Sequence, residues 1–267
     1  MDLNKELQKL EQVQMPKPER VLTMYLNTDL ADPEQQGGEY KIHLKNAMNN
    51  FENYLQESGD KDELKNFRAL RDDVEKYMQR YEQDLSKSII LFASTDGSIW
   101  TALPVQLPVK SEFHWEESPV LDQFKELKKQ SPKTGIILVQ QQNVKIVEAQ
   151  LGALEGTKEY ELDLDVEDWR EKVGPHQANP SMGSGGKSPQ KDLFDDKFKA
   201  HQHRWYKSLA PTLDKMAKDH GWETIYLVGD KEEAEDIQSH MNKPIHEVVN
   251  KNLLQYEEHK VIEEVAL

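Results

Sequence analysis

Hydrophobic residues in the first half of the chain form two patterns: short unbroken runs, and runs spaced three or four residues apart. The unbroken run Val21–Asn27 predicts a buried strand, and Ser88–Ser94 and Ser98–Pro104 predict two strands around a turn. The wider spacing predicts amphipathic helices within residues 1–20, 40–54, 64–85 and 118–130. Because Ser131-Pro132 ends the last helix, we place a domain boundary there.

The second half begins with three predicted strands. Gly135–Gln140 and Val144–Leu151 flank a short connection suited to a hairpin, and Lys158–Leu164 alternates as a third strand. After a long irregular stretch, helical spacing runs from Asp192 to His220. Pro211 is expected to kink this helix or divide it in two.

A strand at residues 224–228, a helix from about residue 232, and a final strand and helix complete the predicted elements. Three meandering strands, a long helix and strand–helix units predict a mixed sheet with helices packed on it. The sequence therefore predicts an α/β (α+β) protein with two domains, residues 1–131 and 132–267.

Composition excludes several classes of protein. The chain has 267 residues, a formal net charge of −15 and no cysteine. No apolar run approaches the roughly 18 residues of a membrane span, and the N-terminus lacks the apolar stretch of a secretory signal. The absence of cysteine excludes disulfides, thiol catalysis and iron–sulfur ligation, and we expect a cytoplasmic location. The acidic balance argues against a protein that coats nucleic acid non-specifically.

One stretch departs from this composition. Residues 174–190 (GPHQANPSMGSGGKSPQ) hold four of the 13 glycines and three of the 12 prolines. No acidic residue lies between Lys172 and Lys191. A loop of this length inside a compact domain is uncommon and is usually functional or disordered. A flexible surface linker is the simple interpretation, and a functional loop is the alternative.

The helix that follows has two different faces. Residues spaced for a packing face are Phe194, Phe198, His201, Trp205, Leu209, Leu213 and Met216. The basic residues of the other face are Lys191, Lys197, Lys199, His203, Arg204 and Lys207. From Ser181 to Lys207, six Lys and Arg against three Asp give a local charge of +3. We therefore expect local contact with RNA, although the chain as a whole is acidic.

Other chemistries fit the sequence less well. The segment GSGGKS invites a phosphate-binding P-loop interpretation, but that motif requires Gly at position 181, where the chain has Ser. His201 and His203, two apart on a helix, point in nearly opposite directions, so no metal site is expected from them. A Gly-Gly loop instead lets backbone approach an ester closely, and nearby amides could position water and stabilise an oxyanion.

The segment GSGGKSPQKDLFDDKFKAHQHRWYKSLAPTL (183–213) resembles the catalytic-loop region of archaeal and eukaryotic class-1 peptide-chain release factors. TIYLVGDKE (224–232) follows in the order expected of their central domain. The upstream segment 86–127 resembles the end of their N-terminal domain. The resemblance is strongest to bacterial members related to Vms-type peptidyl-tRNA hydrolases. It implies a ribonuclease-H-like second domain with a long Gly-rich loop and a long helix.

The resemblance also implies site residues. It places Gly185, Gly186, Lys187 and Gln190 at the catalytic loop, with Lys187 where the family has Gln after its glycines. If the register is set by the Tyr of the helix, Gln190 matches the family's water-positioning Gln. The family's stop-codon-reading Asn-Ile-Lys-Ser motif is absent from the corresponding region, Lys41–Met48, so stop-codon decoding is not expected.

The expected partners are therefore the large ribosomal subunit, at its peptidyl-transferase centre, and tRNA. No membrane, DNA, metal or cofactor is expected, and no GTPase-recruiting domain is apparent. Three functions remain open: peptidyl-tRNA hydrolysis in ribosome rescue, a non-catalytic ribosome-binding factor of the hibernation or protection type, and a generic nucleotide-binding α/β protein.

Overall fold

The structure, a computed structural model, describes residues 2–33, 35–82, 86–163, 168–171 and 189–267. For residues 163, 168–171 and 189–197 the description extends to the backbone alone. Contacts divide the chain into two compact units, Met1–Gln130 and Ser131–Leu267. No helix in the described ranges is long and apolar enough to cross a bilayer.

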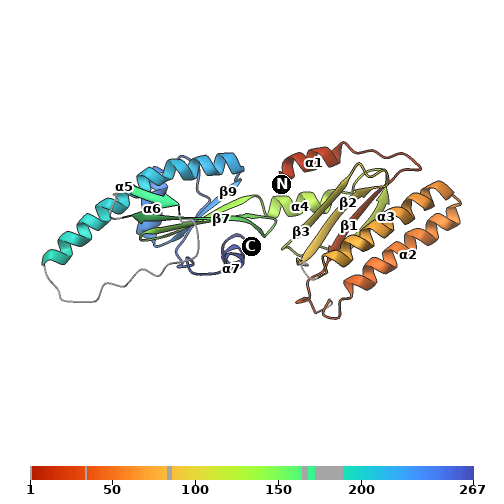
Figure 1. The fold of residues 1–267 in the computed structure, drawn as a ribbon, viewed down its shortest axis with the longest axis horizontal. Coiled ribbons are helices and arrows are strands. Elements are labelled where there is room, and N and C mark those ends of the chain that lie inside the picture. Colours follow the sequence, from red (N-terminus) through yellow and green to blue (C-terminus); the bar gives the residue numbers. More distant parts are fainter. Residues whose placement is uncertain (1, 34, 83–85, 164–167, 172–188) are drawn as a thin grey trace. The chain divides into compact units, whose positions relative to one another are not determined.

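The first unit is a four-stranded antiparallel sheet with helices on its faces (Figure 1). Its strands are β1 (Val21–Asn27), β2 (Ser88–Ser94), β3 (Trp100–Val105) and β4 (Glu112–Glu116), in the order β3-β2-β1-β4. Its helices are α1 (Leu3–Glu11), α2 (Tyr40–Ser58), α3 (Lys61–Arg80) and α4 (Asp122–Gln130). This mixed architecture confirms the predicted fold class for the unit.

Both faces of the central strand β1 are covered, which explains its unbroken apolar sequence. Leu22, Met24 and Leu26 point to one face and join the cluster formed with α2 and α3. On the other face Tyr25 lies edge-on to Phe92, and Phe92 contacts Phe124 of α4. The alternation along β1 therefore separates two apolar layers.

The second unit is a six-stranded mixed sheet in the order β10-β9-β5-β6-β7-β8. Its strands are β5 (Thr134–Gln140), β6 (Asn143–Gln150), β7 (Ala153–Asp163), β8 (Asp168–Glu171), β9 (Thr224–Gly229) and β10 (Glu247–Val249). Its helices are α5 (Pro189–His220), α6 (Lys231–His240) and α7 (Glu258–Ala266). Strands β5 to β8 pair antiparallel, whereas β9 is parallel to β5 and β10 is parallel to β9.

Alternating residues of β5 explain how the helices are divided between the faces of this sheet. Ile137 and Val139 pack in the cluster that contains α5 and α6. Ile136 and Leu138 pack on the opposite side with Val261 of α7. The predicted mixed sheet with packed helices is confirmed; the more specific ribonuclease-H-like assignment stays a prediction.

Several expected boundaries differ from the structure. The first helix ends at Glu11, before Pro16 and Pro18, and α4 begins at Asp122 rather than at residue 118. Strand β7 begins at Ala153, five residues earlier than expected, because it continues pairing with β6 through an irregularity at Glu148/Ala149. Strands β4 and β8 were not predicted at all.

Of the two outcomes expected at Pro211, division of the long helix is wrong, and a kink stays a prediction. Helix α5 is continuous from Pro189 to His220 and includes Pro211. Proline removes one backbone donor and crowds the preceding turn. Here Leu209, Ala210 and Leu213 are fully buried around it, so packing against the sheet holds the helix together.

Candidate functional site

The Gly-rich loop singled out by the sequence lies outside the described residues. Gly185, Gly186 and Lys187 fall within 172–188, so their roles stay predictions. Gln190 is the second residue of α5, which begins at Pro189. Proline favours a first helical position, where its missing N–H would have no intrahelical partner. The backbone of Gln190 therefore belongs to a helix terminus rather than to the loop.

The buried face of α5 follows the predicted stripe. Trp205, Leu209, Leu213 and Met216 are buried in the core cluster of the second unit, as expected from their spacing. Tyr206, which the stripe did not include, is also almost fully buried. The second half of α5 is thus fixed to the sheet, whereas Figure 1 shows its first turns extending beyond the sheet.

The opposite face of α5 is basic and open to solvent. Lys199, Arg204 and Lys207 are exposed, and none of them takes part in an ion pair within the described ranges. Lys191 and Lys197 belong to the same helix. We call Lys199, Arg204 and Lys207 the basic face. It offers positive charge to an anionic partner without first breaking an internal pair.

His203 differs from Lys199, Arg204 and Lys207 because it has an internal partner. Its Nδ1 lies 2.7 Å from Oδ1 of Asp236 on α6. The Nε2 of His240 lies 3.5 Å from the same oxygen. The donor atoms of these three side chains all lie within 4.8 Å of one another.

The sequence does not predict this cluster, because its only closely spaced histidine pair on the long helix is His201 and His203, which point in nearly opposite directions. Asp236 and His240 are four residues apart on α6, so they share a helix face. The sequence shows that spacing. It does not show that Asp236 and His240 lie close to His203, because that proximity depends on how α5 and α6 pack.

A hydrogen-bonded network holds α5 to the turn between β5 and β6. The Nε2 of Gln202 lies 3.0 Å from each of three oxygens: the Gln141 carbonyl, the Tyr206 hydroxyl and Glu233 Oε1. The Tyr206 hydroxyl donates to the same carbonyl, and the Glu233 carboxylate accepts from the Gln141 backbone N–H. Burial, reinforced by Glu233, raises the pKa of Tyr206 far above its ordinary value, so it remains a neutral donor. The network therefore fixes the middle of α5, which carries the basic face, against the β5–β6 turn and α6.

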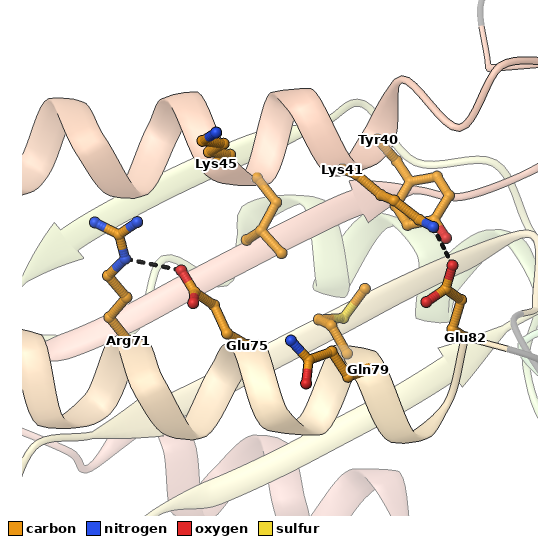
Figure 2. A pocket seen from close by; sticks show the side chains of 9 residues that line it. Tyr40, Lys41, Lys45, Arg71, Glu75, Gln79 and Glu82 are labelled. Carbon is orange, nitrogen blue, oxygen red and sulfur yellow. Dashed lines mark hydrogen bonds and ion pairs between the residues drawn. The ribbon is translucent and has the colours of Figure 1, made fainter.

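The first unit contains a cavity of about 310 Å³ between α2 and α3 (Figure 2). Figure 2 shows Lys41 directed at Glu82, and Arg71 hydrogen-bonded to Glu75. These pairs largely neutralise the charged rim, so the cavity does not present a basic site. Residues 41–48, the region that corresponds to the release-factor stop-codon motif, lie within the helix α2.

A second cavity, of about 240 Å³, lies at the carboxyl ends of the parallel strands β5 and β9. Ligands often bind at such ends. Its two carboxylates already have partners, because Asp230 caps α6 and Glu233 accepts from Gln141. The basic face and the helix start at Gln190 remain the stronger candidate site.

Comparisons with known proteins bear on the family of the chain. Residues 132–267 match the family model described as bacterial archaeo-eukaryotic release factor family 5. The chain is 40% identical to the uncharacterized protein YocB of Bacillus subtilis (strain 168) over 263 residues, 98% of each chain.

Two solved structures are more distantly similar. One is described as an archaeal protein, with a TM-score of 0.31 and 13% identity over 100% of this chain and 70% of that one. The other is the archaeal translation termination factor aRF1, with a TM-score of 0.29 and 12% identity over 98% of this chain and 72% of that one. The family model matches residues 132–267, and the 40% identical relative aligns over 98% of each chain. The chain therefore belongs to the bacterial archaeo-eukaryotic release factor family 5.

Proposed function

We propose that this protein is a ribosome-associated, release-factor-like peptidyl-tRNA hydrolase that acts in ribosome rescue or quality control. Membership in a release-factor family indicates a ribosome-associated function. The observation that carries the finer proposal is the architecture of α5. Its second half is buried in the core, its middle presents the basic face, and its start at Pro189 carries Gln190.

The length of α5 suits insertion into a narrow RNA-lined site. A helix of 32 residues measures about 48 Å at 1.5 Å per residue. Its buried half gives a rigid base, and the basic face can contact phosphates near the entrance of the site. The net charge of −15 disfavours other close contacts with rRNA, so the protein meets RNA locally.

The proposed reaction is hydrolysis of the ester that joins the peptide to the 3′ end of tRNA. Water attacks the carbonyl carbon and the bond to the ribose oxygen breaks. One proton of the water passes to the ribose oxygen of the departing tRNA, and the other is released as the new peptide carboxylic acid ionises. In this proposal Gln190 positions the water, and backbone N–H groups near Gly185 and Gly186 stabilise the oxyanion.

Lys187 supports a second candidate function. It stands directly after Gly185-Gly186, where the resemblance places the family's catalytic Gln. A Lys at this position favours a factor that occupies the same ribosomal site without hydrolysis. This candidate predicts binding to large subunits but no release of peptide.

A peptide-release assay distinguishes the two. Stalled ribosome–nascent-chain complexes are incubated with the wild-type protein, and free peptide is measured. Hydrolysis predicts release by the wild type and a loss of about 100-fold in Gln190→Ala, because misplacement of a reactant by about 1 Å can cost that much in rate. Release by Gln190→Ala at the wild-type rate would remove Gln190 from the mechanism.

Gln238→Ala serves as the matched control. Gln238 is an exposed glutamine of α6 in the same unit. It should release peptide at the wild-type rate. If the wild type co-sediments with large subunits but releases nothing, the non-catalytic function is the correct one.

A further inference from the structure

We propose that His203, Asp236 and His240 form a binding site for a divalent transition-metal ion, with Zn²⁺ as the favoured ion. The three donor atoms are close enough for one ion to reach all of them. The site joins α5 to α6 and is independent of whether the protein hydrolyses peptidyl-tRNA.

The donor spacing fits a metal with short bonds. Zn–N and Zn–O bonds of about 2.0–2.2 Å at tetrahedral angles place donor atoms roughly 3.3–3.5 Å apart. The distance from His240 Nε2 to Asp236 Oδ1 is 3.5 Å, and that from His203 Nδ1 to the same oxygen is 2.7 Å. The His203 ring must move away from Asp236 by less than about 1 Å, and its ligand atom lies within 4.8 Å of that of His240. Its side chain is 55% exposed, so it has room to move.

The surroundings of His240 favour a role as a metal ligand over a role in an internal hydrogen-bond network. Its Nε2 is closed off from solvent and makes no hydrogen bond within the described part of the chain. A buried polar nitrogen without a hydrogen bond or a metal ion as its partner lowers the free energy of unfolding. A metal bound through Nε2 would satisfy it, with Asp236 and His203 as the other two ligands.

The ligand types select the class of ion. Two imidazole nitrogens and one carboxylate suit Zn²⁺, Co²⁺ or Ni²⁺, whereas Mg²⁺ and Ca²⁺ prefer oxygen ligands. Three protein ligands leave a fourth position, which water can fill on the exposed side of His203.

Contacts on both sides of the cluster hold the two helices in place. On one side Gln202 of α5 donates to Glu233 of α6 at 3.0 Å. On the other side the carboxylate of Asp214 accepts from the backbone N–H groups of Asn242 and Lys243, just after α6. The site therefore lies on two fixed helices, so metal binding requires little ordering of the backbone.

The test is metal binding by the tag-free, full-length protein after treatment with a chelator. Co²⁺ is titrated into the protein and followed by its visible absorption, and Zn²⁺ is then added to displace it. We expect one Zn²⁺ per chain and a higher Tm with Zn²⁺. We also expect at least about tenfold weaker binding in His240→Ala, Asp236→Asn and His203→Ala, since loss of even an outer-shell partner costs about 10–100-fold.

His259→Ala is the matched control, because His259 is an exposed histidine on α7. It should bind Zn²⁺ as tightly as the wild type. Far-UV circular dichroism without metal checks that each variant folds; if His240→Ala does not, the half-exposed His203→Ala decides the outcome. Absence of stoichiometric Zn²⁺ binding by the wild type would overturn the proposal. Wild-type affinity in the folded ligand variants would overturn it equally.

Discussion

The indole ring of Trp222 lies directly over the backbone of Gly135, so closely that a Cβ on Gly135 would come within 2.3 Å of the ring. Gly135 belongs to β5, and Trp222 follows the C-terminus of α5. The indole N–H donates to the buried carboxylate of Glu148 on β6 at 3.0 Å. This contact fixes the end of α5 against the centre of the sheet.

Gly135→Ala should lower the free energy of unfolding by about 3 kcal/mol, because the new methyl group must displace a packed ring. Chemical denaturation monitored by Trp fluorescence measures the change. Gly156→Ala is the control: Gly156 lies in β7, and its added Cβ would meet nothing within 4 Å. The control should match the wild type or gain stability. Equal stability of both variants would show that the Trp222 ring moves aside freely.

A buried lysine links α7 to the sheet of the second unit. Lys145 of β6 is 8% exposed, and its Nζ lies 2.7 Å from Glu258 Oε1. A second carboxylate, that of Glu159, lies 4.0 Å from the same nitrogen. The hydrogen bond from Lys145 is the main cause that holds the pKa of Glu258 below its ordinary value of 4.5.

This pair predicts a specific dependence of stability on pH. Because the folded pKa of Glu258 is lowered, its contribution is full above pH 4.5 and disappears as the pH falls through the lower folded pKa. Glu258→Gln should therefore destabilise the protein at pH 7 by about 1 kcal/mol and flatten the acid limb of the stability curve. Urea denaturation at several pH values measures both effects.

Glu264→Gln is the control for this prediction. Glu264 pairs with Lys251 at 2.7 Å, but both side chains are about half exposed. Solvent screening makes such pairs weak, so the variant should follow the wild-type curve within error. If Glu258→Gln also follows the wild-type curve, the link from Lys145 to α7 does not contribute to stability.

The predictable parts of the fold are those in which side-chain burial follows a simple period. The unbroken apolar run of β1 and the helical stripe of α5 both lie where the sequence places them. Strand β8 (DWRE) has no such pattern; in the described part of the chain it pairs only with β7 and is defined by backbone hydrogen bonds. Strand β4 does alternate, with Phe113 and Trp115 packed on the cluster with α2 and α3, but the strand has only five residues.

In the candidate site, too, the predictable residues are those whose exposure follows the helical period. Lys199, Arg204 and Lys207 are exposed as their helical positions indicate. Tyr206 packs in the same core cluster as Leu209 and Leu213, three and seven residues further on, but its hydroxyl bonds to the Gln141 carbonyl, a partner distant in sequence that no local pattern shows. The contact between His203 and Asp236 likewise depends on the packing of two helices, which no local pattern encodes.

The last prediction concerns the basic face and the salt dependence of ribosome binding. Removing one cation that binds a phosphate should reduce the slope of log K against log salt by about 0.7–0.9. Replacing Lys199, Arg204 and Lys207 together with Ala should therefore weaken binding and reduce this slope by about 2–3. The control, Lys215→Ala with Lys218→Ala, changes two exposed lysines near the other end of α5 and should keep the wild-type slope. Co-sedimentation with large subunits over a salt series measures the slopes. An unchanged slope in the triple variant would mean that another surface of the protein contacts the rRNA.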